Sequence, residues 1–119
     1  MAHIMVVDDD PDILALTEEI LRTAGHDVVR APGGLAALDI LDGRRPLDLL
    51  VTDVMMPGLN GFNLARMAKA RRPGLKILYL SGYSEAEHVT RDRGVRFGKM
   101  LSKPIQPVEL RREVAAALS

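Results

Sequence analysis

Short apolar stretches recur at nearly even intervals along the chain. Each is rich in Val, Ile and Leu and lacks an alternation of apolar and polar positions, which is typical of strands buried on both faces. This pattern predicts strands at His3–Val7, Asp27–Ala31, Asp48–Thr52, Lys76–Leu80 and Lys99–Ser102.

Segments with the helical spacing of apolar residues lie between the predicted strands. The first begins after Asp10, a predicted N-cap, with Pro11 at the first helical position and Gly25 just past the end. Asn60 is a second predicted N-cap. The predicted helices cover Pro11–Ala24, Leu35–Leu41, Gly61–Arg71, Glu85–Arg93 and Pro107–Leu118.

Strand and helix therefore alternate five times along the chain. Right-handed crossovers return each strand in the same direction, so this order predicts an α/β fold. We expect a doubly wound parallel sheet with helices on both faces, which makes three layers. A chain of 119 residues has room for one domain of common size, so we expect a single domain over residues 1–119.

The composition and charge of the chain exclude several classes of function. Hydrophobic residues make up 47% of the chain and charged residues 27%, as in ordinary globular proteins. Sixteen Lys and Arg residues balance sixteen Asp and Glu residues, which disfavours direct binding of nucleic acid. The absence of cysteine excludes disulfides, thiolate metal sites and cysteine nucleophiles. With no apolar run near the roughly 20 residues of a membrane helix and no secretory leader pattern, we expect a cytoplasmic protein without membrane contact.

Polar side chains follow the predicted strands at their carboxyl ends. Asp8 and Asp9 follow the first strand, and Asp53 follows the third. Ser81 follows the fourth strand and Lys103 follows the fifth. In an open parallel sheet these ends share one edge, which is where ligands bind. The sequence therefore predicts one site that contains all five residues.

Carboxylates that lie close together repel one another, so such a cluster implies a cation. The chain has no cysteine and no pair of histidines at ligand spacing, so Mg²⁺ or Mn²⁺ fits this oxygen-rich site better than zinc. The ammonium of Lys103 and the hydroxyl of Ser81 are groups suited to binding phosphoryl oxygens. The site is therefore predicted to receive a phosphoryl group.

Four sequence runs carry a resemblance to a known family. They are IMVVDDDPDIL, LLVTDVMMPGLNG, ILYLSGY and LSKPI, in this order and each at the end of a predicted strand. Over essentially its whole length the chain resembles the receiver domains of two-component response regulators, such as the chemotaxis regulator CheY. The resemblance implies a flavodoxin-like (βα)₅ fold with strand order 2-1-3-4-5. The run SGY resembles receivers of hybrid histidine kinases and of some single-domain regulators.

The resemblance also implies a role for the acidic residues. Asp53 would be the phosphoacceptor, with Asp8 and Asp9 as the acidic pair that helps it to hold Mg²⁺. The backbone carbonyl of Met55 would be a further metal ligand. The donor would be a sensor histidine kinase or a histidine phosphotransfer protein, so the domain would catalyse its own phosphorylation and slow dephosphorylation without turning over another substrate.

The same resemblance implies how the phosphoryl group would be sensed. Lys103, joined to Pro104 by a cis peptide bond, would contact the phosphate, and Ser81 would be the switch hydroxyl. Its movement would bias the domain between two states that differ in their helical faces. A protein target would then bind the face of the fourth helix, fifth strand and fifth helix, and the domain would be a monomer or a phosphorylation-dependent dimer.

Met100 departs from the family pattern. Many receivers have Tyr or Phe three residues before the lysine of strand five, whereas methionine has neither a ring nor a hydroxyl. Tyr83, two residues after Ser81, is a candidate substitute as a switch residue. Together with Met55, it is also a candidate shield of an acyl phosphate against water.

Three other functions stay open on the sequence. A haloacid-dehalogenase-type phosphatase would need a second Asp two residues after the nucleophile, where this chain has Met55. A flavodoxin-like cofactor module would need a loop rich in Ser, Thr and Gly after the first strand, where this chain has DDDPD. An interaction scaffold without phosphotransfer would not need Asp8, Asp9, Asp53 and Lys103.

Overall fold

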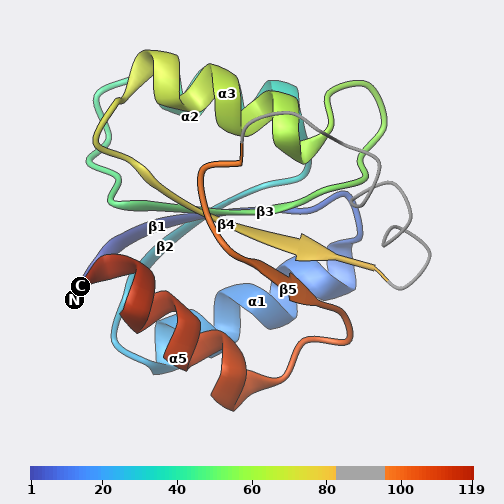
Figure 1. Ribbon diagram of the computed structural model, residues 1–119, viewed down its shortest axis with the longest axis vertical. Coiled ribbons are helices and arrows are strands. Elements are labelled where there is room, and N and C mark those ends of the chain that lie inside the picture. The colour runs from blue at the N-terminus through green and yellow to red at the C-terminus, as the bar shows by residue number, and fades with distance from the viewer. Residues whose placement is uncertain (83–95) are drawn as a thin grey trace.

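The sheet is parallel throughout, and its strand order is β2-β1-β3-β4-β5 (Figure 1). This computed structural model describes residues 1–82 and 96–119, so the helix predicted at Glu85–Arg93 and the residue Tyr83 lie outside the described residues. The predicted topology is confirmed. The described elements are β1 (His3–Val7), α1 (Pro11–Thr23), β2 (Asp27–Ala31), α2 (Gly34–Asp42), β3 (Leu49–Asp53), α3 (Gly61–Arg71), β4 (Lys76–Ser81), β5 (Met100–Ser102) and α5 (Pro107–Leu118).

Helices cover both faces of the sheet. In Figure 1, α2 and α3 lie on one side of the strands, and α1 and α5 lie on the other. Successive residues of a strand point to opposite faces of the sheet, and each face has its own hydrophobic core. Met5 packs beneath α2 and α3, whereas Ile4 packs beneath α1 and α5. Because both faces are buried, the strands appear in the sequence as unbroken apolar runs. None of the helices in the described part of the chain is long and apolar enough to cross a membrane.

Both predicted N-caps are confirmed. The carboxylate of Asp10 accepts hydrogen bonds from the backbone N–H groups of Asp12 at 2.9 Å and Ile13 at 3.3 Å. The side-chain carbonyl of Asn60 accepts one from the backbone N–H of Asn63 at 2.8 Å. These bonds satisfy amide groups that the first turn of a helix leaves without partners. They determine where α1 and α3 begin, and both helices start close to the carboxyl ends of the strands.

Two strands extend one residue beyond their predicted ends. Asp53 is the last residue of β3, where it pairs with Leu80 in the ladder. Ser81 is the last residue of β4, where it pairs with Ser102. Two of the predicted site residues are therefore held by the sheet itself, which restricts their backbones more than a loop would.

Gly61 packs directly on the backbone of the residue that ends β3. It is the first residue of α3, and its N–H donates to the carbonyl of Val54 at 2.7 Å. A Cβ atom at this position would lie 2.1 Å from the carbonyl oxygen of Asp53. No side chain larger than hydrogen fits there unless the backbone moves.

Replacing Gly61 by Ala should therefore destabilise the protein. Ala in place of Gly within a helix ordinarily stabilises by about 0.5–1 kcal/mol, but the steric clash should reverse the sign and cost roughly 1–3 kcal/mol. Urea denaturation of both proteins measures the difference. Gly74→Ala is the control, because a Cβ there meets nothing within 4 Å. Equal stability of the two variants would contradict the prediction.

Candidate functional site

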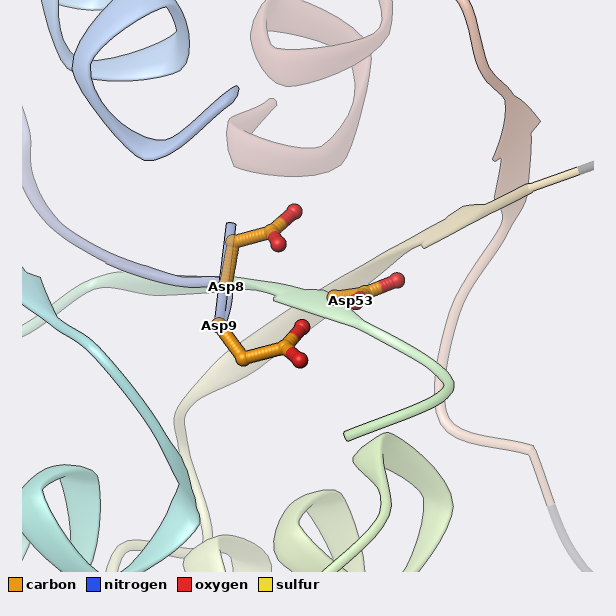
Figure 2. Close-up of side chains that lie close together, drawn as sticks. All are labelled: Asp8, Asp9 and Asp53. Atoms are coloured by element: carbon orange, nitrogen blue, oxygen red, sulfur yellow. The ribbon is translucent and has the colours of Figure 1, made fainter. Parts of the chain in front are cut away.

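Three carboxylates converge at the carboxyl ends of two adjacent strands. Asp8 and Asp9 follow β1, Asp53 ends β3, and their side chains point into a common space (Figure 2). One oxygen atom of each lies within 4.8 Å of those of the other two. Asp8 and Asp53 are 3% and 2% exposed, whereas Asp9 is exposed to solvent. The structure thus brings together the three carboxylates that the sequence predicts as metal ligands.

The ammonium group of Lys103 lies between the two buried carboxylates. Its Nζ atom is 3.0 Å from Oδ2 of Asp8 and 3.0 Å from Oδ1 of Asp53. Burial by itself lowers the pKa of Lys103, but the interactions with Asp53 and Asp8 outweigh that effect, so the pKa is raised above its usual value. At neutral pH the site therefore holds a permanent positive charge.

The backbone around β5 brings Lys103 to this position. β5 continues the parallel ladder beside β4, and the N–H of Lys103 donates to the carbonyl of Ser81 at 2.7 Å. The peptide bond between Lys103 and Pro104 is cis, as the resemblance implied. The side chain of Lys103 then reaches past the end of β4 to the end of β3.

The two oxygens of Asp8 have different surroundings. Oδ1 accepts a hydrogen bond from the backbone N–H of Asp10 at 2.9 Å. Oδ2 is buried and accepts no hydrogen bond from the described residues, although the ammonium of Lys103 lies 3.0 Å away. A buried carboxylate oxygen without a hydrogen bond, in a set of oxygen donors, fits the coordination of a hard divalent cation. The cluster could therefore hold such a cation.

The other predicted site residues lie around this cluster. Ser81 is 4% exposed, and its hydroxyl donates a bond of 3.3 Å to the carbonyl of Gly82. Met55 lies in the loop after β3 with 41% of its surface exposed. Met100 begins β5, is half-buried, and packs against the core on the α3 side of the sheet. The roles of Ser81, Met55 and Met100 stay predictions, as does that of Tyr83, which lies outside the described residues.

Tyr79 was not among the residues that the sequence predicts for the site. Tyr79 is fully buried on β4 and pairs with Met100 across the β4–β5 ladder. Its ring centroid lies 5.2 Å from that of Phe62, and its hydroxyl accepts the N–H of Phe97 at 3.3 Å. The structure thus places an aromatic ring next to Met100, although on the neighbouring strand. The only sequence signal was a tyrosine within an otherwise aliphatic strand.

Comparison with known proteins agrees with this fold. The family model of the response regulator receiver domain matches residues 4–115. The response regulator receiver protein CpdR of Brucella abortus (strain 2308) is 32% identical over 99% of this chain and 98% of its own length. The sporulation initiation phosphotransferase F of Bacillus subtilis (strain 168) is 28% identical over 93% of this chain and 89% of its own length. The structure of the chemotaxis response regulator CheY4 of Vibrio cholerae is 28% identical, covers 99% of both chains and superposes with a TM-score of 0.86.

The strand order and the superposition on CheY4 make this a CheY-like fold, with acidic groups and a lysine at the carboxyl edge of the sheet. The chain belongs to the family of response regulator receiver domains of two-component systems. Receiver domains are signalling domains and not classical enzymes. The expected family, fold class and parallel strand order are thereby confirmed.

Replacing Lys103 by Met should destabilise the protein in buffer free of divalent cations, because two buried carboxylates lose their shared counter-charge. We expect a loss of roughly 3–5 kcal/mol at pH 7, as for other buried ion pairs that lose one partner. Urea denaturation of both proteins at pH 7 measures this difference.

Lys99→Met is the matched control for this experiment. The ammonium of Lys99 lies 3.0 Å from Glu113, but the lysine side chain is 64% exposed. Exposed ion pairs contribute little, so its loss should cost less than about 1 kcal/mol. Similar losses for the two variants would contradict a central role for Lys103.

Proposed function

We propose that this chain is a phosphoacceptor receiver of a two-component phosphorelay. Asp53 accepts a phosphoryl group from the histidine of a sensor kinase or of a histidine phosphotransfer protein. The observation that carries the proposal is the ammonium of Lys103, 3.0 Å from both Asp8 and Asp53, with Asp9 beside them. Membership of the receiver family supports it.

The reaction is the transfer of one phosphoryl group. An oxygen of Asp53 attacks the phosphorus atom of a phosphohistidine, the P–N bond breaks, and its electron pair stays on the imidazole of the donor. The product is an acyl phosphate on Asp53. The ammonium of Lys103, 3.0 Å from the carboxylate of Asp53, would neutralise a phosphoryl oxygen on that residue.

The acidic residues prepare the site for a cation. Asp8, Asp9, Asp53 and the backbone carbonyl of Met55 would hold Mg²⁺ or Mn²⁺. Such an ion supplies further positive charge to the phosphoryl oxygens. The buried Oδ2 of Asp8, which accepts no hydrogen bond from the described residues, supports this assignment.

Signalling would start from Ser81. Its hydroxyl makes a long bond of 3.3 Å to the carbonyl of the next residue, so turning toward a phosphoryl group on Asp53 costs little. Met100 would accompany this movement by repacking, because a thioether adapts its shape and forms no strong hydrogen bond. Tyr83 would be a second switch residue and, with Met55, would shield the acyl phosphate from water.

The partners follow from this cycle. A downstream protein would bind the face formed by β5, α5 and the predicted helix at Glu85–Arg93. We assign the protein to the cytoplasm, as a monomer or a phosphorylation-dependent dimer, without direct contact to nucleic acid or membrane. Family membership favours this function over a phosphatase or a flavin module.

Phosphotransfer profiling tests the acceptor and finds the donor. Purified histidine kinases carrying labelled phosphoryl groups are each mixed with the wild type, Asp53→Asn and Asp10→Asn. We expect the wild type and Asp10→Asn to take up label from the same kinase, because Asp10 is a helix cap. Asp53→Asn should take up less than about 1% of the label, since it lacks the nucleophile. Equal labelling of the wild type and Asp53→Asn would refute the proposal.

Cation binding is tested by thermal denaturation. Mg²⁺ at tenfold excess over its dissociation constant should stabilise the wild type by about 1.4 kcal/mol, which raises the melting temperature by roughly 3–8 °C. The variant Asp8→Asn/Asp9→Asn should lose this shift, because it lacks two oxygen ligands of full charge. The control Asp10→Asn/Asp12→Asn should keep it. An unchanged shift in the first variant would exclude the proposed ligands.

A further inference from the structure

Charge is distributed unevenly over a chain whose formal net charge is zero. From Gly61 to Leu80 the sequence has five basic residues and no acidic one. In Figure 1 the end of α3 and the start of β4 lie at the same end of the molecule as the two chain termini. We define the basic edge as the cations of this end, namely Arg44, Arg45, Lys69, Arg71, Arg72 and Lys76, of which Lys76 shares the face of β4 that packs toward α5.

The opposite end of the molecule is acidic. It carries the carboxylates of the candidate site and the start of α1, namely Asp8, Asp9, Asp10, Asp12 and Asp53. Because the strands are parallel, their starting ends and carboxyl ends lie at opposite ends of the sheet. The basic edge and these carboxylates therefore lie at opposite ends of the strands, with Lys103 among the carboxylates and Asp27 and Asp42 among the cations.

Backbone carbonyls hold two cations of the basic edge in place. The guanidinium of Arg72 donates to the carbonyls of Leu41 at 3.2 Å and Gly43 at 3.0 Å, and also to that of Arg45. The ammonium of Lys69 donates to the carbonyls of Pro73 and Leu75 at 2.7 and 2.9 Å. Carbonyl groups orient these cations and, being neutral dipoles, offset only part of their charge. The positive groups are thus preorganised.

Few acidic groups neutralise this edge. Arg71 pairs with Asp42 at 2.6 Å, and Arg45 lies 3.7 Å from Asp27. Arg44 and Lys76 are exposed, and no acidic side chain pairs with either among residues 1–82 and 96–119. An exposed cation without a partner can bind an external anionic group without first breaking an ion pair.

A hollow of about 440 Å³ borders Lys76. Apolar atoms of Ala2, Leu47 and Leu118 line one part of it, and Lys76 lines another. Asp48 also lines it, but this carboxylate accepts the backbone N–H of His3 at 2.8 Å. The hollow therefore combines a place for an apolar side chain with a cation that has no acidic partner among the described residues.

We propose that the basic edge and this hollow form a docking surface for an acidic segment of another protein. Carboxylates of the segment would pair with Arg44 and Lys76, and one apolar side chain would enter the hollow. A protein is favoured over nucleic acid because no Phe, Tyr or Trp among the described residues lines the hollow, so bases find no stacking platform. Asp53 ends β3, whereas this surface lies toward the starting ends of the strands, so a docked partner would leave the proposed phosphoacceptor accessible.

The test uses an eight-residue fluorescent peptide of alternating Glu and Leu as the probe. Its affinity is measured by anisotropy for the wild type and for Arg44→Glu/Lys76→Glu. The control Arg111→Glu/Arg112→Glu changes two exposed residues of α5 and alters the net charge equally. We expect the first variant to bind about tenfold more weakly and the control to stay within about twofold of the wild type.

Two further probes test the contribution of the apolar side chain and the preference for a peptide over nucleic acid. Replacing Leu by Ser in the peptide should weaken binding to the wild type, because the hollow then stays empty. An octathymidylate should bind more weakly than the peptide. Equal weakening by both protein variants, or tighter binding of the oligonucleotide, would overturn the proposal. As a control, Arg44→Glu/Lys76→Glu should still form a beryllofluoride adduct at Asp53. The adduct shows that this variant is folded and that its loss of peptide binding is independent of the proposed phosphoacceptor site.

Discussion

The ammonium of Lys103 between two buried carboxylates is the interaction on which the site depends. Asp8 and Asp53 follow or end adjacent strands, and both lie almost wholly out of solvent. Burying two negative charges together is costly unless a positive charge accompanies them. Lys103 supplies that charge from a third strand, so the ends of β1, β3 and β5 are electrostatically connected. The same arrangement keeps a cation beside the predicted acceptor before any phosphoryl group arrives.

This arrangement requires the parallel strand order. β1 and β3 are neighbours, so their carboxyl ends place Asp8 and Asp53 together. β5 is separated from β3 by β4, and only a long side chain such as lysine bridges that distance. Gly61 brings α3 against the carbonyl of Asp53, which closes the backbone around the site. Chemistry at one sheet edge thus depends on packing over most of the fold.

A parallel sheet also separates functions in space. Its carboxyl edge gathers the acidic groups, while its opposite edge gathers the cations that follow α2 and α3. The formal net charge of zero does not reveal this distribution, because it sums charges over the whole chain. A partner at the proposed docking surface would therefore leave the proposed phosphoacceptor accessible.

The sequence by itself determined the order of elements, both helix caps and the set of residues at the strand ends, because apolar runs, capping residues and polar strand ends are local signals. It did not determine that Asp8 is buried while Asp9 is exposed, since adjacent identical side chains differ only in what packs around them. Nor did it reveal that Tyr79 lies beside Met100 or that Arg72 binds the loop after α2. Those relations join segments far apart in the chain, so strand register and helix packing decide them, and only the tertiary structure contains both.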